Sequence, residues 1–298
     1  MINTKPKKVT PSAHEDAVAS KRTVVNRQTE SPAYRLAFLD DDFILQDELR
    51  PVRLQLELLK PELLMQKNSI ESTVVVFGSA RFQERQTAQD ELNKIQKMAD
   101  EKSSPALQRS LDAAKRAVVN SNYYEEARKL AVIISKNCQH PSRNTHVVVT
   151  GGGPGIMEAA NRGAEEAGAK SIGLNIVLPH EQAPNTYITP DLCFQFHYFA
   201  IRKMHFLIRA RALIAFPGGF GTMDELFETL TLIQTHRIKP MPVLLFGRDF
   251  WRRVVNFEAL VEEGTISESD LRLFSYVETA EEAWEYIARF NGLEEGTK

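Results

Sequence analysis

Short apolar runs alternate with longer amphipathic segments along most of the chain. The runs are rich in β-branched and aromatic residues, and several end in glycine or proline, which is typical of buried strands. We expect strands in STVVVFGSARF (72–82), HVVVT (146–150), IGLNIVLP (172–179), CFQFH (193–197), ALIAFP (212–217), PVLLFG (242–247) and FSYVE (274–278). We expect helices over about residues 86–137, 156–169, 198–210, 222–235, 250–264 and 280–290. This alternation predicts an α/β fold, a doubly wound parallel sheet with helices on both faces.

The first 70 residues do not follow this pattern. The first 30 contain no aromatic residue and are rich in Lys, Thr, Ser and Asn, so we expect residues 1–35 to form a disordered tail. Acids interspersed in this tail argue against a transit peptide or a nucleic-acid-binding arm. Residues 36–70 have leucines at helical spacing and are expected to form a helical extension with a break near Pro61. Residues 71–298 are then the α/β domain.

The overall composition excludes several classes of protein. With 37 basic and 39 acidic residues the formal net charge is -2, so we expect no nucleic-acid partner and no attraction to anionic membranes. Cys138 and Cys193 are far apart, which argues against a disulfide framework and a zinc cluster. No apolar run is long enough to span a membrane, and the N-terminus lacks the apolar core of a secretory signal. These features favour a soluble, cytoplasmic protein.

Three glycine-containing turns follow expected strands. They contain Gly78 and Ser79, the run from Gly151 to Gly155, and the run from Gly218 to Thr222. In a parallel α/β sheet such loops gather at one edge, where backbone N–H groups at helix starts can bind an anion such as phosphate. The predicted ligand-binding residues of the loops are Gly78, Ser79, Gly152, Gly153, Gly218, Gly219, Phe220, Gly221 and Thr222. The alternative is that the glycines only allow the chain to turn from strand to helix.

The loops fit a small phosphate better than a large cofactor. Gly221, and not a lysine, directly precedes Thr222, so the GxxxxGK[ST] loop of nucleoside-triphosphate-binding proteins is missing. Ile156 stands where a dinucleotide fingerprint needs its third glycine, and the following strand does not end in an acid. A monophosphate or a sugar phosphate remains.

Acidic residues lie beside the last glycine loop, and basic residues lie in the helix before it. Thr222 and Glu225 have the spacing of a capping box, in which the glutamate only secures the start of its helix. The alternative is that Glu225 points past a bound phosphate toward the group attached to it. Arg202 and Lys203 begin the preceding helix on the ligand side of the sheet, although solvent-facing charges on an amphipathic helix are the ordinary explanation.

The segments PGGFGTMDE (217–225) and RKMHF (202–206) together resemble the PGGxGTxxE and Arg-Lys motifs of the LOG (lonely guy) family, often labelled "lysine decarboxylase-like". The resemblance covers about residues 72–290. It implies a homodimeric, Rossmann-like hydrolase that cleaves the N-glycosidic bond of nucleoside 5′-monophosphates, or of cytokinin riboside 5′-monophosphates, to free base and ribose 5-phosphate. By the same resemblance Arg202 and Glu225 are catalytic, the Gly218–Thr222 loop binds phosphate, and Lys203 and Glu181 contact substrate.

The chemistry implied by the resemblance agrees with the residue types. Cleavage of a ribosyl C–N bond develops positive charge on the sugar, which a fixed carboxylate at Glu225 can stabilise. We expect no cofactor and no metal: a pyridoxal enzyme needs a Schiff-base lysine with its own partners, and Lys203 alone does not indicate one. A non-enzymatic nucleotide or cofactor binder is the alternative function. A DNA-handling protein is disfavoured because no basic stripe is interleaved with aromatics.

The chain also departs from the short plant-type members of the family. Its first 70 residues and the helical insert after the first strand have no counterpart there, and the segment before Arg202 is longer. The preferred base and the relevance of cytokinin precursors therefore stay open.

Overall fold

The computed structural model describes residues 10–102, 104–140, 143–179 and 183–293. By its internal contacts the chain divides into two units, residues 1–57 and 58–298.

The first unit consists of short helices, and those that precede α3 bury none of their residues. They are α1 (Ala13–Ser20), η1 (Pro32–Tyr34), η2 (Ala37–Leu39), α2 (Asp41–Ile44) and η3 (Asp47–Leu49), followed by α3 (Arg50–Lys67). Helix α1 lies within the range expected to be a disordered tail, and Ser12 and Glu15 form a capping box that secures this helix locally. The tail stays a prediction. Residues 1–9 lie outside the described residues, and the predicted boundaries at residues 35 and 70 stay predictions.

Helix α3 does not break at Pro61, contrary to the expectation. Pro61 lies inside the helix and its side chain is buried. A proline in a helix interior leaves a backbone hydrogen bond unmade. Burial of the proline ring offsets part of this cost, and the helix continues to Lys67.

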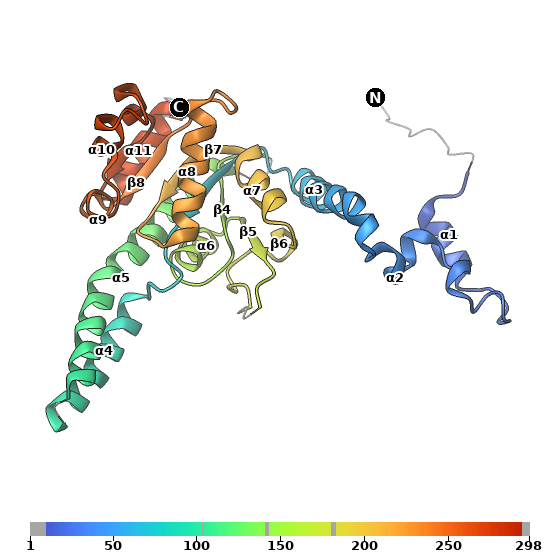
Figure 1. The fold of residues 1–298 in the computed structure, drawn as a ribbon, viewed down its shortest axis with the longest axis horizontal. Helices are drawn as coiled ribbons and strands as arrows, with labels where there is room; N and C mark the ends of the chain where they lie inside the picture. The colour runs from blue at the N-terminus through green and yellow to red at the C-terminus, as the bar shows by residue number, and fades with distance from the viewer. Residues whose placement is uncertain (1–9, 103, 141–142, 180–182, 294–298) are drawn as a thin grey trace. The chain divides into compact units, whose positions relative to one another are not determined.

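Within the described part of the second unit, seven strands form one parallel sheet in the order β6-β5-β4-β1-β7-β8-β9, which confirms the expected fold class (Figure 1). The strands are β1 (Thr73–Phe77), β4 (Val147–Thr150), β5 (Ser171–Ile176), β6 (Cys193–Phe196), β7 (Ala210–Ala215), β8 (Val243–Phe246) and β9 (Ser275–Val277). A small antiparallel pair, β2 (Gln139–His140) and β3 (Arg143–Asn144), was not expected from the sequence.

Helices cover both faces of the sheet. Because successive strand residues point to opposite faces, Val74 and Val76 pack with α5, α6 and α11, whereas Val75 and Phe77 belong to the core under α3, α7, α8, α9 and α10. All four of these β1 side chains are buried. The helices of this unit, besides α3, are α4 (Arg85–Glu101), α5 (Pro105–Cys138), α6 (Ile156–Glu166), α7 (Phe199–Ile208), α8 (Phe220–Gln234), α9 (Arg248–Val254), α10 (Phe257–Glu262) and α11 (Ala280–Asn291). Two 3₁₀ turns, η4 (Pro190–Leu192) and η5 (Glu268–Leu273), complete it.

Two of the expected helices are each split in two. The segment 86–137 divides into α4 and α5 because Ser104 caps a new helix whose first residue is Pro105. Figure 1 shows α4 beside the first half of α5, extending away from the sheet. The segment 250–264 divides into α9 and α10, with Asn256 as the new N-cap.

The order of the strands creates a switch point between β1 and β7. From β1 the chain proceeds outward through β4 and β5 to β6, and then returns to place β7 on the other side of β1. The helices that follow β1 and β7 therefore lie on opposite faces of the sheet, and their loops separate. A ligand-binding crevice forms at such a point in open α/β sheets.

Candidate functional site

The candidate site lies beside the switch point, where the loops after β1, β4 and β7 meet. Three backbone hydrogen bonds join these segments. The Phe216 N–H donates to the Phe77 carbonyl (2.9 Å), the Ser79 N–H to the Pro217 carbonyl (2.9 Å), and the Ile156 N–H to the Ser79 carbonyl (3.1 Å). The β1 loop is thus fixed between the other two, and the three glycine turns of the sequence come together.

A cavity of about 620 Å³ opens between these loops and the first turns of α7 and α8. The predicted site residues that line it are Gly78, Ser79, Arg202, Gly219, Phe220, Gly221, Thr222 and Glu225. A second cavity of about 480 Å³ adjoins it and contains the predicted residue Gly153. Arg202 and Gly151 line both cavities, so the two can hold different parts of one ligand.

Three described residues of the predicted site line neither of these two cavities. Gly152 supports the loop, with φ at +78°, and a Cβ there would lie 2.2 Å from the Asn175 side-chain oxygen. Gly218 lies under the Thr222 hydroxyl, which a Cβ on Gly218 would approach to 2.1 Å. Lys203 lines a different cavity of about 490 Å³. Glu181 lies outside the described residues.

Helix α8 begins earlier than the sequence pattern indicates, and this excludes the capping-box interpretation of Glu225. The N-cap is Gly219 and the first helical residue is Phe220, so Thr222 is the third residue of the helix. Since Thr222 is not the N-cap, the capping box with Glu225 does not form. The glutamate side chain therefore has no part in securing the start of the helix.

The Glu225 carboxyl group is buried and faces the cavity. Its side chain is only 7% exposed, and no described residue donates a hydrogen bond to its carboxylate. Burial raises the pKa of Glu225 to about 7, and Glu228 contributes in the same direction, while Lys203 and Arg202 lower it. A carboxyl group that ionises near neutral pH inside a cavity is suited to acid–base chemistry.

Arg202 supplies a fixed positive charge on the same cavity. Its Nε donates to the Leu174 carbonyl oxygen (2.7 Å), and its guanidinium lies over the Phe206 ring (5.1 Å to the centroid). Burial lowers the pKa of this guanidinium, and the charge of Glu225 partly opposes the effect. A Cβ on Gly151 would lie 2.8 Å from one Arg202 terminal nitrogen, so the absence of a side chain at this position makes room for the guanidinium.

Lys203 pairs with acids instead of entering this cavity. Its Nζ lies 2.9 Å from Asp224 Oδ1 and 3.0 Å from Glu228 Oε2. Burial alone lowers the pKa of Lys203, but these two hydrogen bonds raise it and prevail. In this arrangement the ammonium group neutralises the acids that flank Glu225. The predicted substrate contact of Lys203 stays a prediction.

The N-cap and the first turn of α8 leave space beside their backbone. A Cβ on Gly219 or Gly221 would have no atom within 4 Å, so neither glycine is required by packing. The first N–H groups of a helix have no intrahelical acceptor and carry partial positive charge. Backbone donors and open space at the same place are what a phosphate-binding loop requires. The adjacent Phe220 is 96% exposed, so its ring, like the two glycines, is not required by packing.

The sequence interpretation missed several residues that line the first cavity, among them Arg81, Met157, Phe199 and Asp224. Arg81 stands two residues after the Gly78–Ser79 turn, and Met157 two residues after the second glycine loop, so their positions near predicted loops were the available signal. Phe199 begins α7 and is half exposed at 52%. The apolar side chains are suited to contact a flat, weakly polar group such as a base.

Over the described ranges, no group of three or more His, Cys, Asp and Glu residues is placed to hold a metal ion. None of the helices in the described part of the chain combines the length and the apolar character needed to cross a bilayer.

Comparisons with known proteins agree with the motifs. Residues 157–287 match the family model described as "Possible lysine decarboxylase". Cytokinin riboside 5′-monophosphate phosphoribohydrolase LOG3 of Arabidopsis thaliana is 31% identical over 145 residues, which cover 47% of this chain and 66% of that protein. LOG4 of the same plant is 29% identical over 157 residues, covering 51% of this chain and 71% of that protein. The matches thus span about two thirds of each relative.

The resemblance to the LOG family is confirmed. The range that matches the family model contains both Arg202 and the loop from Pro217 to Glu225, whereas β1 and the glycine loop after β4 precede it. Among solved structures, the Moco carrier protein of Chlamydomonas reinhardtii is 18% identical with a TM-score of 0.44, covering 74% of this chain and 98% of that one. At family level, the LOG relatives support hydrolase activity.

Proposed function

We propose that the protein hydrolyses the N-glycosidic bond of nucleoside 5′-monophosphates, giving the free base and ribose 5-phosphate. The observation that carries the proposal is the placement of a buried, unbonded carboxyl group, Glu225, on the same cavity as Arg202 and the open first turn of α8. The names of the LOG relatives support the same reaction for cytokinin riboside 5′-monophosphates.

In the proposed complex, the 5′-phosphate binds the backbone N–H groups at the start of α8. Gly219 and Gly221 leave room for it, and the helix N-terminus favours its charge. The Asp224 carboxylate would repel the phosphate, but the Lys203 ammonium group, with Nζ 2.9 Å from Asp224 Oδ1, neutralises the charge of Asp224. Fixing the phosphate places the ribose over Glu225 and the base toward the second cavity.

The proposed reaction breaks the bond between ribose C1′ and the base nitrogen. Water adds its oxygen to C1′, one water proton is lost, and the base leaves with a proton. Ionised Glu225 stabilises the positive charge that develops on the sugar and orients or deprotonates the water. Arg202, held by the Leu174 carbonyl, keeps a positive charge beside the leaving base and the phosphate.

Base release from a panel of monophosphates tests the proposal. Purified protein is incubated with AMP, GMP, CMP, UMP and isopentenyladenosine 5′-monophosphate, and free base is measured by chromatography. At least one should yield base, and Glu225→Gln and Arg202→Ala should lower the rate of release by about a hundredfold or more. Glu165→Gln, which removes an exposed carboxylate from α6, is the matched control and should leave it unchanged.

The proposal would be contradicted if well-folded wild-type protein released base from none of these substrates. If the protein binds the monophosphates without cleaving them, and Glu225→Gln binds them equally well, the non-enzymatic alternative takes its place.

The family relationship also leads us to propose a homodimer. Light scattering of the purified chain, with a mass of 33.7 kDa per monomer, distinguishes a dimer from a stable monomer.

A further inference from the structure

Arg81 is a cation at the mouth of the site with no role in the proposed reaction so far. It lies in the loop between β1 and α4, its side chain is exposed, and it lines both the 620 Å³ and the 480 Å³ cavity. In the described part of the chain its guanidinium forms no ion pair. Of the two basic residues that line the first cavity, Arg202 uses its Nε to bond the Leu174 carbonyl oxygen, whereas the Arg81 guanidinium bonds no described residue, so all its donors are available to a ligand.

The loop that carries Arg81 is fixed just before this residue. The Arg81 N–H donates to the Ser79 hydroxyl (3.1 Å), and the Ser79 N–H and carbonyl are bonded to Pro217 and Ile156. The backbone of Arg81 therefore has a defined position relative to the loop that precedes α8.

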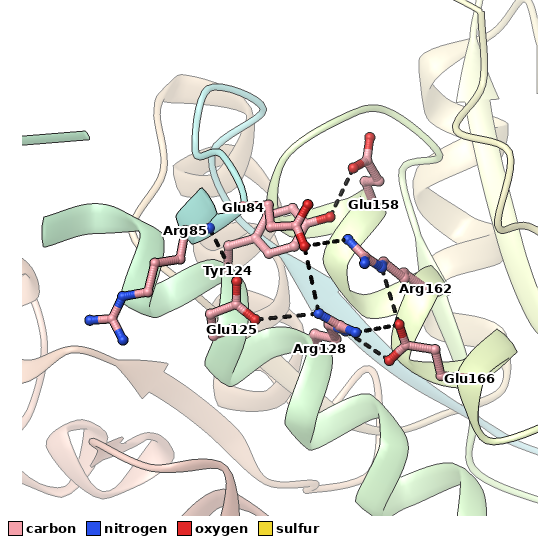
Figure 2. Close-up of polar contacts among 8 residues, drawn as sticks. All are labelled: Glu84, Arg85, Tyr124, Glu125, Arg128, Glu158, Arg162 and Glu166. Carbon is pink, nitrogen blue, oxygen red and sulfur yellow. Dashed lines mark hydrogen bonds and ion pairs between the residues drawn. The ribbon is translucent and has the colours of Figure 1, made fainter. Parts of the chain in front are cut away.

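The loop is also fixed just after Arg81, by a cluster of charged residues from α5 and α6. Figure 2 shows Glu84 directed toward Arg162 and Arg128, at 3.1 Å and 3.9 Å. Both arginines bind Glu166, with Arg128 Nε at 2.7 Å and Arg162 Nε at 3.1 Å. These side chains are 20–35% exposed, so each pair adds little to stability. Their joint geometry restrains Glu84 and so limits where the preceding loop can move.

The first cavity is lined by charged side chains of both signs, which determine how it can bind an anionic ligand. The basic residues on its wall are Arg81 and Arg202, and the acidic residues are Asp224 and Glu225. Lys203 forms an ion pair with Asp224. A phosphate monoester carries about -1.5 to -2 charges at neutral pH, and it would lie at the start of the helix that carries both acids. Beyond the backbone donors, an exposed arginine whose guanidinium bonds no described residue is the side chain best suited to bind it.

We propose that Arg81 is a second phosphate-binding group of the site, which closes on the 5′-phosphate opposite the first turn of α8. Glu84 is its positioning residue, held by Arg162 and Arg128. The assignment depends on the proposed function only in that the ligand is a sugar phosphate.

Binding of ribose 5-phosphate, the phosphate-bearing product, tests the assignment without requiring catalysis. Isothermal titration at fixed, near-physiological salt compares wild type with Arg81→Ala and Arg81→Lys. Arg85→Ala is the matched control, because Arg85 is also exposed, lies four residues away and points away from the cluster in Figure 2. Arg81→Ala should weaken binding by about tenfold to a hundredfold, the range of a hydrogen bond to a charged group. Arg81→Lys should retain part of the affinity, and Arg85→Ala should bind like wild type.

Glu84→Gln tests the positioning role. It should weaken ribose 5-phosphate binding by several-fold while leaving the urea midpoint of unfolding close to that of wild type. Unchanged affinity in Glu84→Gln would refute the role of Glu84.

Wild-type affinity in Arg81→Ala, or an equal loss in Arg85→Ala, would overturn the assignment of Arg81, as would a wild-type protein that does not bind ribose 5-phosphate. Base release measured in parallel separates the two proposals. Arg81-dependent binding without base release refutes only the hydrolase, whereas base release with Arg81-independent binding refutes only the assignment of Arg81.

Discussion

Replacing Glu225 by glutamine should stabilise the protein at neutral pH, in a way that depends on pH. Burial raises the pKa of Glu225 from its usual 4.5 to about 7. In the unfolded chain the same group ionises at its usual pKa, so at neutral pH and above folding must either keep a proton on Glu225 or bury its charge. The difference between the two pKa values corresponds to about 3 kcal/mol at full ionisation.

The sign follows from the direction of the shift. A carboxyl group with a raised pKa in the folded state favours folding fully below about pH 4.5, and this contribution is lost as pH rises through about 7. Glutamine has nearly the same shape and does not titrate. The free energy of unfolding of Glu225→Gln minus that of wild type should therefore grow by about 2 to 3 kcal/mol between about pH 5 and about pH 8.

Urea unfolding of both proteins at several pH values measures this difference. Glu165→Gln, which removes an exposed carboxylate, should show no comparable trend and controls for the loss of a negative charge. A difference between Glu225→Gln and wild type that stays constant over the pH range would refute the reasoning, because it would mean that Glu225 ionises equally easily in the folded and unfolded protein.

Four other predictions concern the same site and the loops and strands around it. Base release by wild type should rise with pH through about 7 as Glu225 ionises, and Glu225→Gln should lower it by about 10² to 10⁴, measured as kcat/KM across pH. Gly221→Ala should fold normally, or gain up to about 1 kcal/mol in unfolding free energy, yet bind ribose 5-phosphate much more weakly in a titration, because a methyl group enters open space at the phosphate loop. Gly152→Ala should instead lose about 1 to 3 kcal/mol in urea unfolding, because φ is +78° and Asn175 lies in the way. Asn161→Ala should lose about 2 to 4 kcal/mol in the same assay, since the fully buried Asn161 amide bonds the Thr150 and Ser171 hydroxyls at 2.7 and 3.0 Å.

The sheet could be predicted from the sequence because its strands are buried on both faces. In β1 all five residues are buried, so the apolar run is continuous and stands out against amphipathic helices. The helix boundaries were harder to predict because they depend on single residues. Ser104 and Pro105 start a second helix within a segment whose periodicity predicts a single helix. Conversely, α3 continues through Pro61, although a proline usually ends a helix.

The residues of the site were predictable where they belong to a local motif and were missed where they depend on distant parts of the chain. Gly219, Gly221 and Glu225 share one strand-to-helix turn, so a single stretch of sequence contains them. Arg81 was missed although it stands two residues after Ser79, because the sequence does not show which side chains next to a glycine turn reach the site. Its place beside α8 results from the strand order, and its loop is held by side chains of α5 and α6, more than 40 residues away.

The capping box illustrates why a local pattern can support two opposite conclusions. The spacing of Thr222 and Glu225 is compatible with a purely structural role, and only the start of the helix at Phe220 excludes it. Once Glu225 is released from capping, its burial without a hydrogen-bond donor has no structural benefit, since glutamine would fill the same space without a charge to bury. A side chain that destabilises the fold at neutral pH is best explained by what it does when ionised, as expected where stability is lost in favour of activity. That explanation depends on the predicted gain in the free energy of unfolding of Glu225→Gln. If glutamine does not stabilise the protein at neutral pH, the buried carboxyl group does not destabilise it there, and its burial is no longer an argument for catalysis.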